Sequence, residues 1–153
     1  MKTNEILPIG NIKINLSANG KKDLINKMCE LLAHSSKVKD LNKVKSEVFE
    51  REKLMTTGIG GGIALPHAKT NYVAGIIGAF AKLKEPVQFD SIDNEPVKYI
   101  YLLVGREDNT GNFLRLLSKL ARIMSEKDYI NQIDKCNSSE EIFDFFVRME
   151  EDE

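Results

Sequence analysis

The sequence is short of the features that would place this protein in a membrane, outside the cell or on nucleic acid. It has no run of about 18 apolar residues, the length that a helix needs to cross a bilayer. Its first residues, MKTNE, lack the apolar core of a signal peptide. The 22 basic and 23 acidic side chains nearly cancel, so no polyanion partner is indicated. These absences predict a cytoplasmic protein that does not bind nucleic acid.

Cysteine and histidine are too few to indicate a metal centre. Cys29 and Cys136 lie far apart and lack the Cys-x-x-Cys spacing of a zinc or redox site. The two histidines, His34 and His67, are too few to complete a zinc site. We predict that both thiols are buried and unreactive, because free cysteine behaves mainly as a small hydrophobic residue. His34 follows a helical pattern and is interpreted as a helix-end residue.

The glycine-rich stretch GIGGGIALPHA does not match the common nucleotide or hydrolase motifs. A P-loop needs glycines before its Lys-Ser/Thr pair, but Ile63 and Ala68 stand in the corresponding positions. The dinucleotide fingerprint needs a third glycine three residues after Gly60, where Ile63 stands. No Gly-x-Ser-x-Gly elbow is present. Nucleotide binding through these motifs and serine hydrolase chemistry are therefore excluded.

The order of helical and strand patterns predicts one α/β domain over residues 1–153, an ordinary length for a single domain. Apolar residues at helical spacing, and a capping box at Ser138 and Glu141, predict helices over 22–34, 40–53, 114–124, 128–134 and 138–149. Runs of β-branched and aromatic residues predict strands at 63–65, 74–81 and 97–104, a short edge strand at 83–89 and a loop across 86–96. Helices before and after the strands predict a mixed, mainly parallel sheet with helices on both faces.

One of the two histidines stands at the end of the glycine-rich stretch. An imidazole beside bare backbone, with a pKa close to neutrality, can accept a chemical group and pass it on. His67 is therefore the candidate nucleophile. The alternative is a structural histidine after the turn that Pro66 introduces, and the residues alone leave both interpretations open.

The stretch from Arg51 to Ala68, REKLMTTGIGGGIALPHA, closely resembles the active-site signature of the phosphotransferase-system (PTS) enzyme IIA domains of the fructose and mannitol type. That family includes the nitrogen-regulatory enzyme IIA paralogues. The resemblance extends to residues 86–103 and 114–124, and so covers almost the whole chain. It implies that His67 takes a phosphoryl group from the phosphocarrier protein HPr, as a tele-phosphohistidine, and passes it to a cysteine of an enzyme IIB domain. It implies no metal and no cofactor.

Two further residues are candidates for stabilising the phosphoryl group. Arg51 matches the family's arginine near the phosphorylated histidine, and a guanidinium pairs well with phosphoryl oxygens. Thr57 and the glycines after it are expected to offer a hydroxyl and backbone N–H groups to the same oxygens. The alternatives are a solvated arginine at a helix end and glycines that serve only a tight turn.

The chain departs from the family pattern at the start of the leucine-rich helix. Many members have a second active-site histidine there, and Phe113 takes its position. A phenyl ring cannot donate a hydrogen bond, so we expect slower transfer with His67 still modifiable. Asn112 is a candidate substitute, although a shift of one residue turns a helical side chain by roughly 100°.

Three functional interpretations follow from the resemblance. The first is a sugar phosphocarrier between HPr and enzyme IIB, with an apolar patch around the His67 cleft facing HPr and at most a peripheral contact with the membrane component. The second is a nitrogen-regulatory-like protein whose phosphorylation state controls its protein partners, which Phe113 favours because a sensor tolerates slow transfer. The third is a homologue that no longer accepts phosphate, and the intact block from Arg51 to His67 argues against it.

Overall fold

The fold is a mixed β-sheet between two groups of helices, described for residues 2–151 in a computed structural model. The helices are α1 (Thr3–Ile6), α2 (Lys21–Glu30), α3 (Leu41–Leu54), α4 (Thr110–Ser125), α5 (Lys127–Lys135) and α6 (Ser139–Glu151), with a 3₁₀ turn, η1 (Ile9–Asn11). The strands are β1 (Ile12–Leu16), β2 (Gly58–Gly60), β3 (Ile63–Ala64), β4 (His67–Thr70), β5 (Ile76–Val87) and β6 (Val97–Arg106). Within residues 2–151, no helix combines the length and apolar character needed to span a bilayer.

The sheet runs in the order β1-β5-β6-β3-β2, with β4 also paired to β6. The pairs β1/β5, β3/β6 and β4/β6 are parallel, whereas β5/β6 and β2/β3 are antiparallel. Strands β3 and β4 lie one after the other along the same edge of β6, and Leu65 and Pro66 separate them. This interruption positions His67 as the first residue of the resumed strand.

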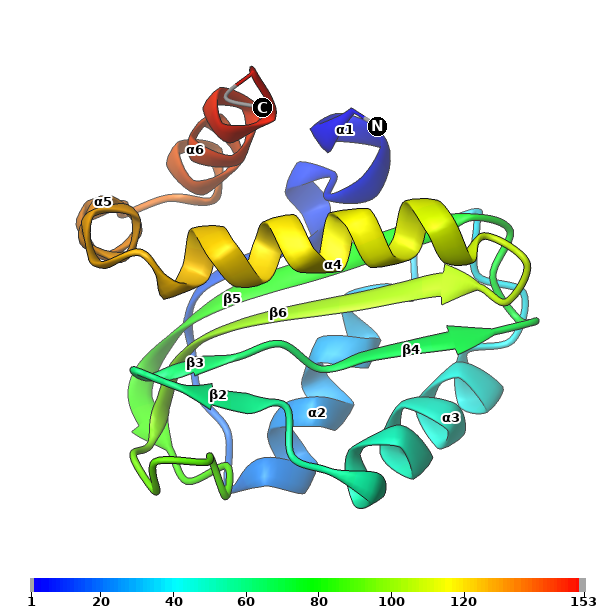
Figure 1. The fold of residues 1–153 in the computed structure, drawn as a ribbon, viewed down its shortest axis with the longest axis horizontal. Coiled ribbons are helices and arrows are strands. Elements are labelled where there is room, and N and C mark those ends of the chain that lie inside the picture. The colour runs from blue at the N-terminus through cyan, green and yellow to red at the C-terminus, as the bar shows by residue number, and fades with distance from the viewer. Residues whose placement is uncertain (1, 152–153) are drawn as a thin grey trace.

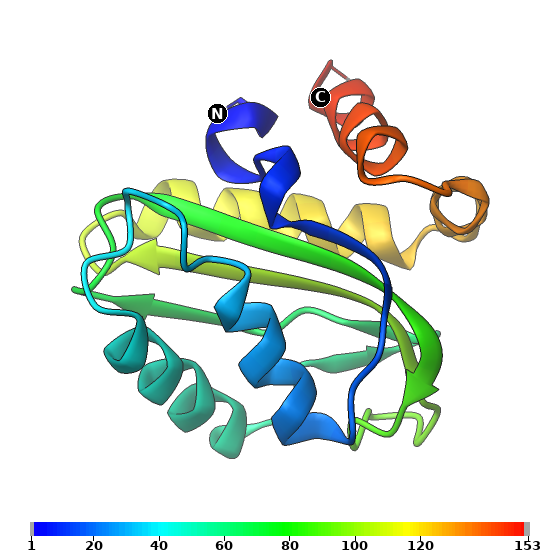
Figure 2. The same cartoon turned by 180° about the vertical axis from the view of Figure 1, so that it is seen from behind.

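Helices cover both faces of this sheet (Figure 1), and the view from behind shows α2 and α3 together on one of them (Figure 2). One apolar cluster joins α2 and α3 to the sheet through residues such as Met28, Val48 and Leu102. A second cluster joins α1, α4, α5 and α6 to the opposite face through residues such as Phe80 and Phe146. The expected α/β fold, with a mixed and mainly parallel sheet covered on both faces, is confirmed.

The predicted helices are present, and α3 and α6 begin at side-chain caps. The side chain of Asp40 accepts a hydrogen bond from the Lys43 backbone N–H at 3.1 Å and caps α3. At the start of α6, the Glu141 N–H donates to Ser138 Oγ at 3.1 Å, and the Glu141 carboxylate accepts from the Asn137 N–H at 3.3 Å. The capping-box spacing therefore predicted a real helix start.

The strand prediction was wrong in one region and incomplete in others. The expected edge strand at 83–89 does not exist separately, because β5 continues to Val87 and lies between β1 and β6. Strands β1, β2 and β4 were not predicted. β1 alternates buried and more exposed positions, as a half-buried strand does, whereas β4 owes its conformation to pairing with β6.

The predicted thiol environments agree with the structure. Cys29 and Cys136 are both buried. Burial raises the pKa of the Cys29 thiol to about 12, so the thiolate that would be reactive is disfavoured at neutral pH.

Candidate functional site

Backbone hydrogen bonds hold the His67 segment to β6, and one backbone carbonyl contacts the imidazole ring. It begins β4 opposite Leu103 of β6, and the Pro66 carbonyl accepts a hydrogen bond from the Leu103 N–H at 3.0 Å. The imidazole Nδ1 lies 2.9 Å from the Leu65 carbonyl oxygen. Because a carbonyl only accepts, Nδ1 must carry the proton in this contact. The lone pair of the neutral ring is then on Nε2.

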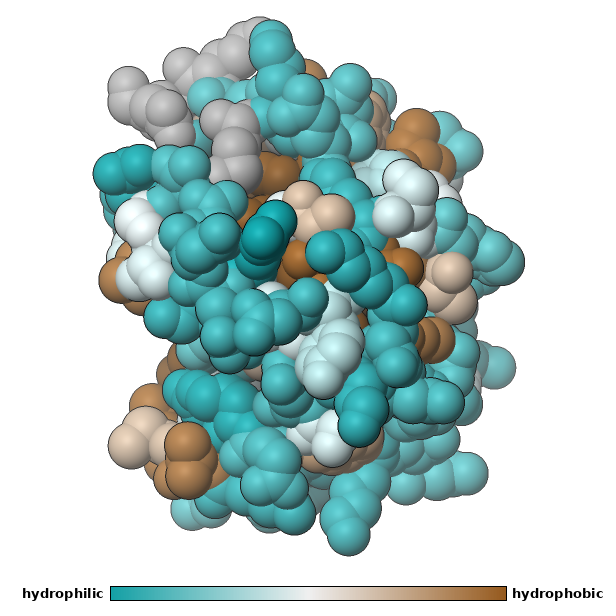
Figure 3. All heavy atoms as spheres, turned by 90° about the vertical axis from the view of Figure 1, so that its right-hand side faces the viewer, coloured by the Kyte–Doolittle hydropathy of each residue, from teal (hydrophilic) through white to brown (hydrophobic). Residues whose placement is uncertain are grey.

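The imidazole lines an open cleft of about 630 Å³ between α3, β4 and α4. Charged side chains of both signs surround it: Arg51 and Lys69 are basic, and Glu47, Glu50 and Glu107 are acidic. Its apolar wall comprises Leu54, Ala68, Phe113, Leu114 and Leu117. The face of the molecule seen from the right-hand side of Figure 1 is mainly hydrophilic, with apolar atoms in small groups (Figure 3). The cleft therefore offers two cations to an anion without forming a strongly basic surface.

Burial is the main cause that lowers the pKa of His67 below its ordinary value of 6.5. The Arg51 charge lowers this pKa further, while the hydrogen bond to Leu65 and the charge of Glu52 oppose the shift. The ring is therefore neutral at physiological pH. Its Nε2 lone pair is then available to a group entering the cleft.

A pH titration of His67 tests this electrostatic environment. We expect the Cε1–H resonance of His67 to titrate with a midpoint below 6.5, because burial and Arg51 both disfavour the imidazolium form. A reaction that needs the neutral ring should therefore fall to half its rate at a pH below 6.5. A peptide of residues 64–70 serves as the unfolded reference. A midpoint in the protein at or above that of the peptide contradicts the expectation.

Arg51 reaches the cleft from the last turns of α3. Its Nη1 donates to the Met55 carbonyl oxygen at 3.1 Å, which ties the side chain to the end of its own helix. A guanidinium has five N–H donors, so this single bond leaves others to meet an anion. Arg51 and His67 line the same cleft, as the resemblance implies.

Thr57 lies in a buried polar cluster with Glu52, and the residues lining the cleft do not include it. Its hydroxyl donates to Glu52 Oε1 at 2.6 Å, and its backbone N–H donates to Glu52 Oε2 at 2.7 Å. Lys21 completes the cluster with an ion pair to Glu52 Oε2 at 2.9 Å. The Thr57 carbonyl accepts from the Leu65 N–H at 2.9 Å. Thr57 thus links the end of α3 to the segment that carries His67.

Loss of the Glu52 carboxylate should destabilise the protein. Glu52→Ala leaves the two buried Thr57 donors and Lys21 without their acceptor, and we expect a loss of about 3 kcal/mol in the free energy of unfolding, allowing for the partial exposure of Lys21. Urea denaturation measures this free energy of unfolding. Glu50→Ala, on the same helix but pairing only with exposed Lys53, should change stability by less than about 0.5 kcal/mol. Equal stabilities of the two variants would refute this role of Glu52.

Phe113 occupies the wall of the cleft beside the histidine. It is 2% exposed, and its ring centroid lies 6.3 Å from that of His67. Gly105 makes room for it, since a Cβ at that position would lie 2.3 Å from Phe113 Cδ1. Asn112 does not substitute for the absent histidine: its side chain is exposed, bonds Asn109 and Arg115, and is not among the residues lining the cleft.

The glycines serve a turn, which confirms the simpler of the two alternatives. Gly60, Gly61 and Gly62 have φ values of +99°, +65° and +81°, a conformation that side chains disfavour, and they join β2 to β3. The Gly61 N–H donates to Asp93 Oδ2 at 3.0 Å. Strand β3 separates this turn from His67, so the expectation that the glycines cradle the transferred group is not supported.

Several cleft residues were not identified from sequence. Glu47 and Leu54 lie four residues before and three residues after Arg51 on α3, so helical spacing from Arg51 would have placed them on the same face. Lys69 follows His67 by two residues on β4, and Leu117 follows Phe113 by four on α4, so strand and helix periodicity would have indicated both. Glu107 lies in the turn before α4 and has no such signal. Glu47 Oε2 is buried and has no hydrogen-bond partner among residues 2–151. In the same range, no three His, Cys, Asp or Glu side chains gather to hold a metal ion.

Comparison with known proteins places this site in a family. Residues 5–149 match the family model described as "Phosphoenolpyruvate-dependent sugar phosphotransferase system, EIIA 2". The fructose-specific EIIABC component of Bacillus subtilis is 31% identical over 144 residues, which are 94% of this chain and only 23% of that protein.

Two solved structures show the same fold. The nitrogen regulatory protein IIA-Ntr of Neisseria meningitidis is 36% identical, with a TM-score of 0.87 over 93% of this chain and 97% of that chain. Escherichia coli enzyme IIA for mannitol, in a complex with phosphorylated enzyme IIB, superposes with a TM-score of 0.76 at 19% identity, over 90% of this chain and 94% of that chain. The chain therefore belongs to the type 2 enzyme IIA family of the phosphotransferase system, phosphoryl-transfer components that work through a phosphohistidine intermediate.

Proposed function

We propose that residues 1–153 form one cytoplasmic enzyme IIA unit that accepts a phosphoryl group from HPr on Nε2 of His67 and passes it to an enzyme IIB cysteine. The observation that carries the proposal is the 2.9 Å contact between His67 Nδ1 and the Leu65 carbonyl. A proton on Nδ1 leaves the lone pair on Nε2, and the imidazole lines the cleft, which supports attack through Nε2 to form a tele-phosphohistidine. His34, the other histidine, is exposed and lies outside this cleft.

The contact with Leu65 is also compatible with both transfer steps, from HPr to His67 and from His67 to enzyme IIB. When Nε2 attacks, the P–N bond to the histidine of HPr breaks and a P–Nε2 bond forms, while the Nδ1 proton stays in place. The ring then carries positive charge, which the Leu65 carbonyl stabilises by a charge-assisted hydrogen bond. In the second step a IIB thiolate attacks phosphorus, the P–Nε2 bond breaks, and the neutral ring is restored. No proton has to leave the site in either step.

Arg51 and Lys69 supply positive charge where the phosphoryl oxygens arrive. Phosphoryl transfer between two nucleophiles depends mainly on positioning and charge stabilisation, and both cations line the His67 cleft. For Thr57 we propose a supporting role, because Glu52 already accepts both its hydroxyl and its backbone N–H. Thr57 would hold the Leu65 segment in place and so maintain the direction of the imidazole.

Exposed leucines at the cleft provide a surface for protein partners. Leu54 is 81% exposed and Leu114 is 52% exposed, and they line the cleft from α3 and α4 respectively. Met55, beside Leu54, is 67% exposed. Large apolar side chains exposed around a reactive group are typical of docking surfaces. We propose that HPr and enzyme IIB use this surface in turn, since each must bring its own reactive group to Nε2.

A regulatory role in nitrogen metabolism is the second candidate function. Phe113 lines the cleft where many family members have a second imidazole, and slower phosphoryl transfer is expected without that imidazole. A regulatory protein tolerates slow transfer better than a protein that must pass on phosphoryl groups as fast as sugar is transported. The likeness to IIA-Ntr of Neisseria meningitidis, at 36% identity over 93% of this chain, supports this alternative. In this alternative, phosphorylation of His67 would alter which protein binds the cleft surface.

A two-stage phosphorylation experiment tests both candidates. In the first stage, the purified protein is incubated with phosphoenolpyruvate, enzyme I and HPr, and intact-mass spectrometry monitors its phosphorylation. In the second stage, the protein is mixed with enzyme IIB domains of the fructose and mannitol types. We expect one added phosphoryl group. Its transfer to a IIB cysteine supports the sugar phosphocarrier, and its retention with every IIB domain supports the regulatory protein. Absence of labelling, with an active control enzyme IIA labelled in parallel, overturns the phosphocarrier proposal.

A further inference from the structure

A second cavity lies on the far side of α4 from the His67 cleft. It has a volume of about 250 Å³ and is enclosed by α1, α4, α6 and the sheet. α4 separates the two sites: Phe113, Leu114 and Leu117 line the His67 cleft, whereas Leu116 and Leu120 line this cavity. An engineered cavity of about 150 Å³ holds benzene, so this one has room for roughly ten non-hydrogen atoms.

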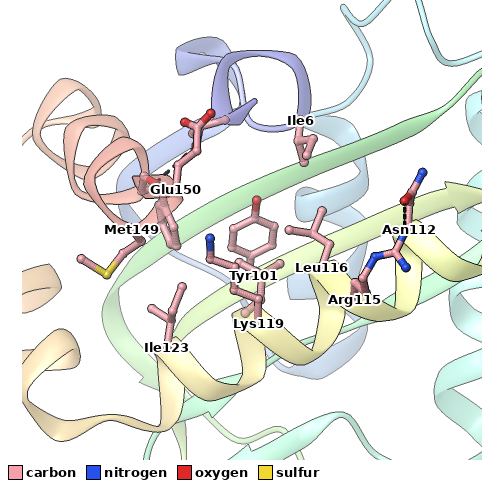
Figure 4. A pocket seen from close by; sticks show the side chains of 12 residues that line it. Ile6, Tyr101, Asn112, Arg115, Leu116, Lys119, Ile123, Met149 and Glu150 are labelled. Carbon is pink, nitrogen blue, oxygen red and sulfur yellow. Dashed lines mark hydrogen bonds between the residues drawn. The ribbon is translucent and has the colours of Figure 1, made fainter. Parts of the chain in front are cut away.

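The floor of the cavity carries the hydroxyl of Tyr101. Tyr101, on β6, is 3% exposed, and its side chain rises from the sheet into the space between α4 and α1 (Figure 4). No group among residues 2–151 forms a hydrogen bond with its hydroxyl. A buried tyrosine hydroxyl normally has a partner, and this one is directed into a cavity instead. An oxygen atom of a bound molecule would satisfy it.

The two ends of the cavity differ in chemistry. Ile123 and Met149 lie at one end, and Arg115 and Asn112 at the other (Figure 4). The Phe146 ring packs against Tyr101 with a centroid distance of 5.4 Å and adds to the apolar part. Arg115 donates through Nη2 to the Asn112 side chain, which leaves its other N–H groups for an anion. Positions 115 and 123 are about 12 Å apart along the helix, the length of a short amphipathic molecule.

We propose that this cavity binds a small monocarboxylic acid with an apolar body. The carboxylate lies at Arg115, with one oxygen accepting from the Tyr101 hydroxyl, and the apolar body extends toward Ile123. Lys119 also lines the cavity from α4, and Glu150 lines it from α6. A cavity with positive charge at one end and apolar side chains at the other favours one anionic group over a neutral or doubly charged ligand.

Octanoate, with about ten non-hydrogen atoms, is the probe for this site, and octan-1-ol is its neutral match. The NMR chemical shifts of the backbone amides of residues 1–153 are recorded during each titration. We expect saturable octanoate binding, with perturbations at Ile6, Tyr101 and Leu120, and at least tenfold weaker binding of octan-1-ol. Arg115→Gln should weaken octanoate binding about tenfold, and Tyr101→Phe, which removes only the hydroxyl, about fivefold. Lys84→Gln, an exposed change on β5, should leave binding unchanged.

A cavity-filling variant makes the test decisive. Leu116 is only partly buried, so Leu116→Trp should fill the cavity from its mouth without unfolding the protein, which the dispersion of the amide spectrum verifies. We expect this variant to lose octanoate binding. The proposal is overturned if the wild type shows no saturable binding, if octanol binds as well as octanoate, or if the perturbations centre on His67. Undiminished binding to a folded Leu116→Trp protein would also overturn it.

Discussion

Replacement of His67 by glutamine should abolish phosphoenolpyruvate-dependent labelling of this protein. Glutamine keeps a polar side chain of similar reach, but its amide nitrogen has no lone pair available to attack phosphorus. We expect intact mass to show no phosphorylated species after enzyme I and HPr have fully labelled the wild type, a reduction in rate of more than about 10³-fold, of the order that loss of a nucleophile produces. The fold should persist, because His67 is only half-buried and its ring makes one hydrogen bond.

His34→Gln is the matched control for this experiment. His34 is the other histidine of the chain, and its side chain is exposed. This variant should be labelled at the wild-type rate. If His34→Gln loses the label and His67→Gln keeps it, the phosphoryl acceptor has been assigned to the wrong residue. A label that survives in the double variant His34→Gln/His67→Gln would exclude histidine as the acceptor.

Removal of the Arg51 charge should produce the next largest effect. Arg51→Gln keeps a polar side chain with an N–H donor, although a shorter one, and withdraws a cation from the phosphoryl oxygens. Loss of one such stabilising donor typically costs about 10²- to 10³-fold in rate, and we expect a reduction of that size in transfer from HPr. Arg51→Lys should retain part of the rate, because it restores a charge without the planar fork of the guanidinium. Single-turnover transfer from phosphorylated HPr measures the rates of both variants.

The same substitution has a second, independent readout. The Arg51 charge lowers the pKa of His67, so Arg51→Gln should raise that pKa toward its ordinary value. Lys53→Gln, on the same helix but paired with Glu50 at the surface, should change neither the rate nor the pKa. An Arg51→Gln protein with a transfer rate within twofold of the wild type would show that Lys69 or the backbone supplies the needed stabilisation.

The helices could be predicted because their signals are local. Apolar residues three and four positions apart indicated α2 and α4, and Ser138 with Glu141 marked the start of α6. Strands were harder to predict because their partners are remote. β4 reads His-Ala-Lys-Thr, which has little strand character, and it is a strand because β6 lies beside it. The continuation of β5 through Lys84 and Glu85 was missed because polar residues and Pro86 resemble a loop in sequence.

The candidate site was only partly accessible from sequence. Resemblance pointed to His67 and Arg51, and the structure brings them to one cleft. Thr57 was expected to face the phosphoryl group, but the structure pairs it with Glu52, five residues earlier in the chain. Asn112 was considered a substitute for the second histidine, but helical rotation directs it to the other side of α4. These differences concern the direction of side chains, which depends on the packing of each helix against the sheet.

The sequence by itself determined the groups available to this protein: a candidate nucleophilic imidazole, an arginine earlier in the same motif, phenylalanine rather than histidine at position 113, and helices with one apolar face. These properties depend on residue type and on neighbours within a few positions. Only the tertiary structure decided that the Leu65 carbonyl holds the proton on Nδ1, that α4 separates the His67 cleft from the Tyr101 cavity, and that exposed leucines surround the imidazole. The contact between His67 and Leu65 joins residues two positions apart, and its geometry depends on the pairing of β3 and β4 with β6. The other two arrangements require segments far apart in the chain to meet, which depends on the order and direction of the strands in the sheet.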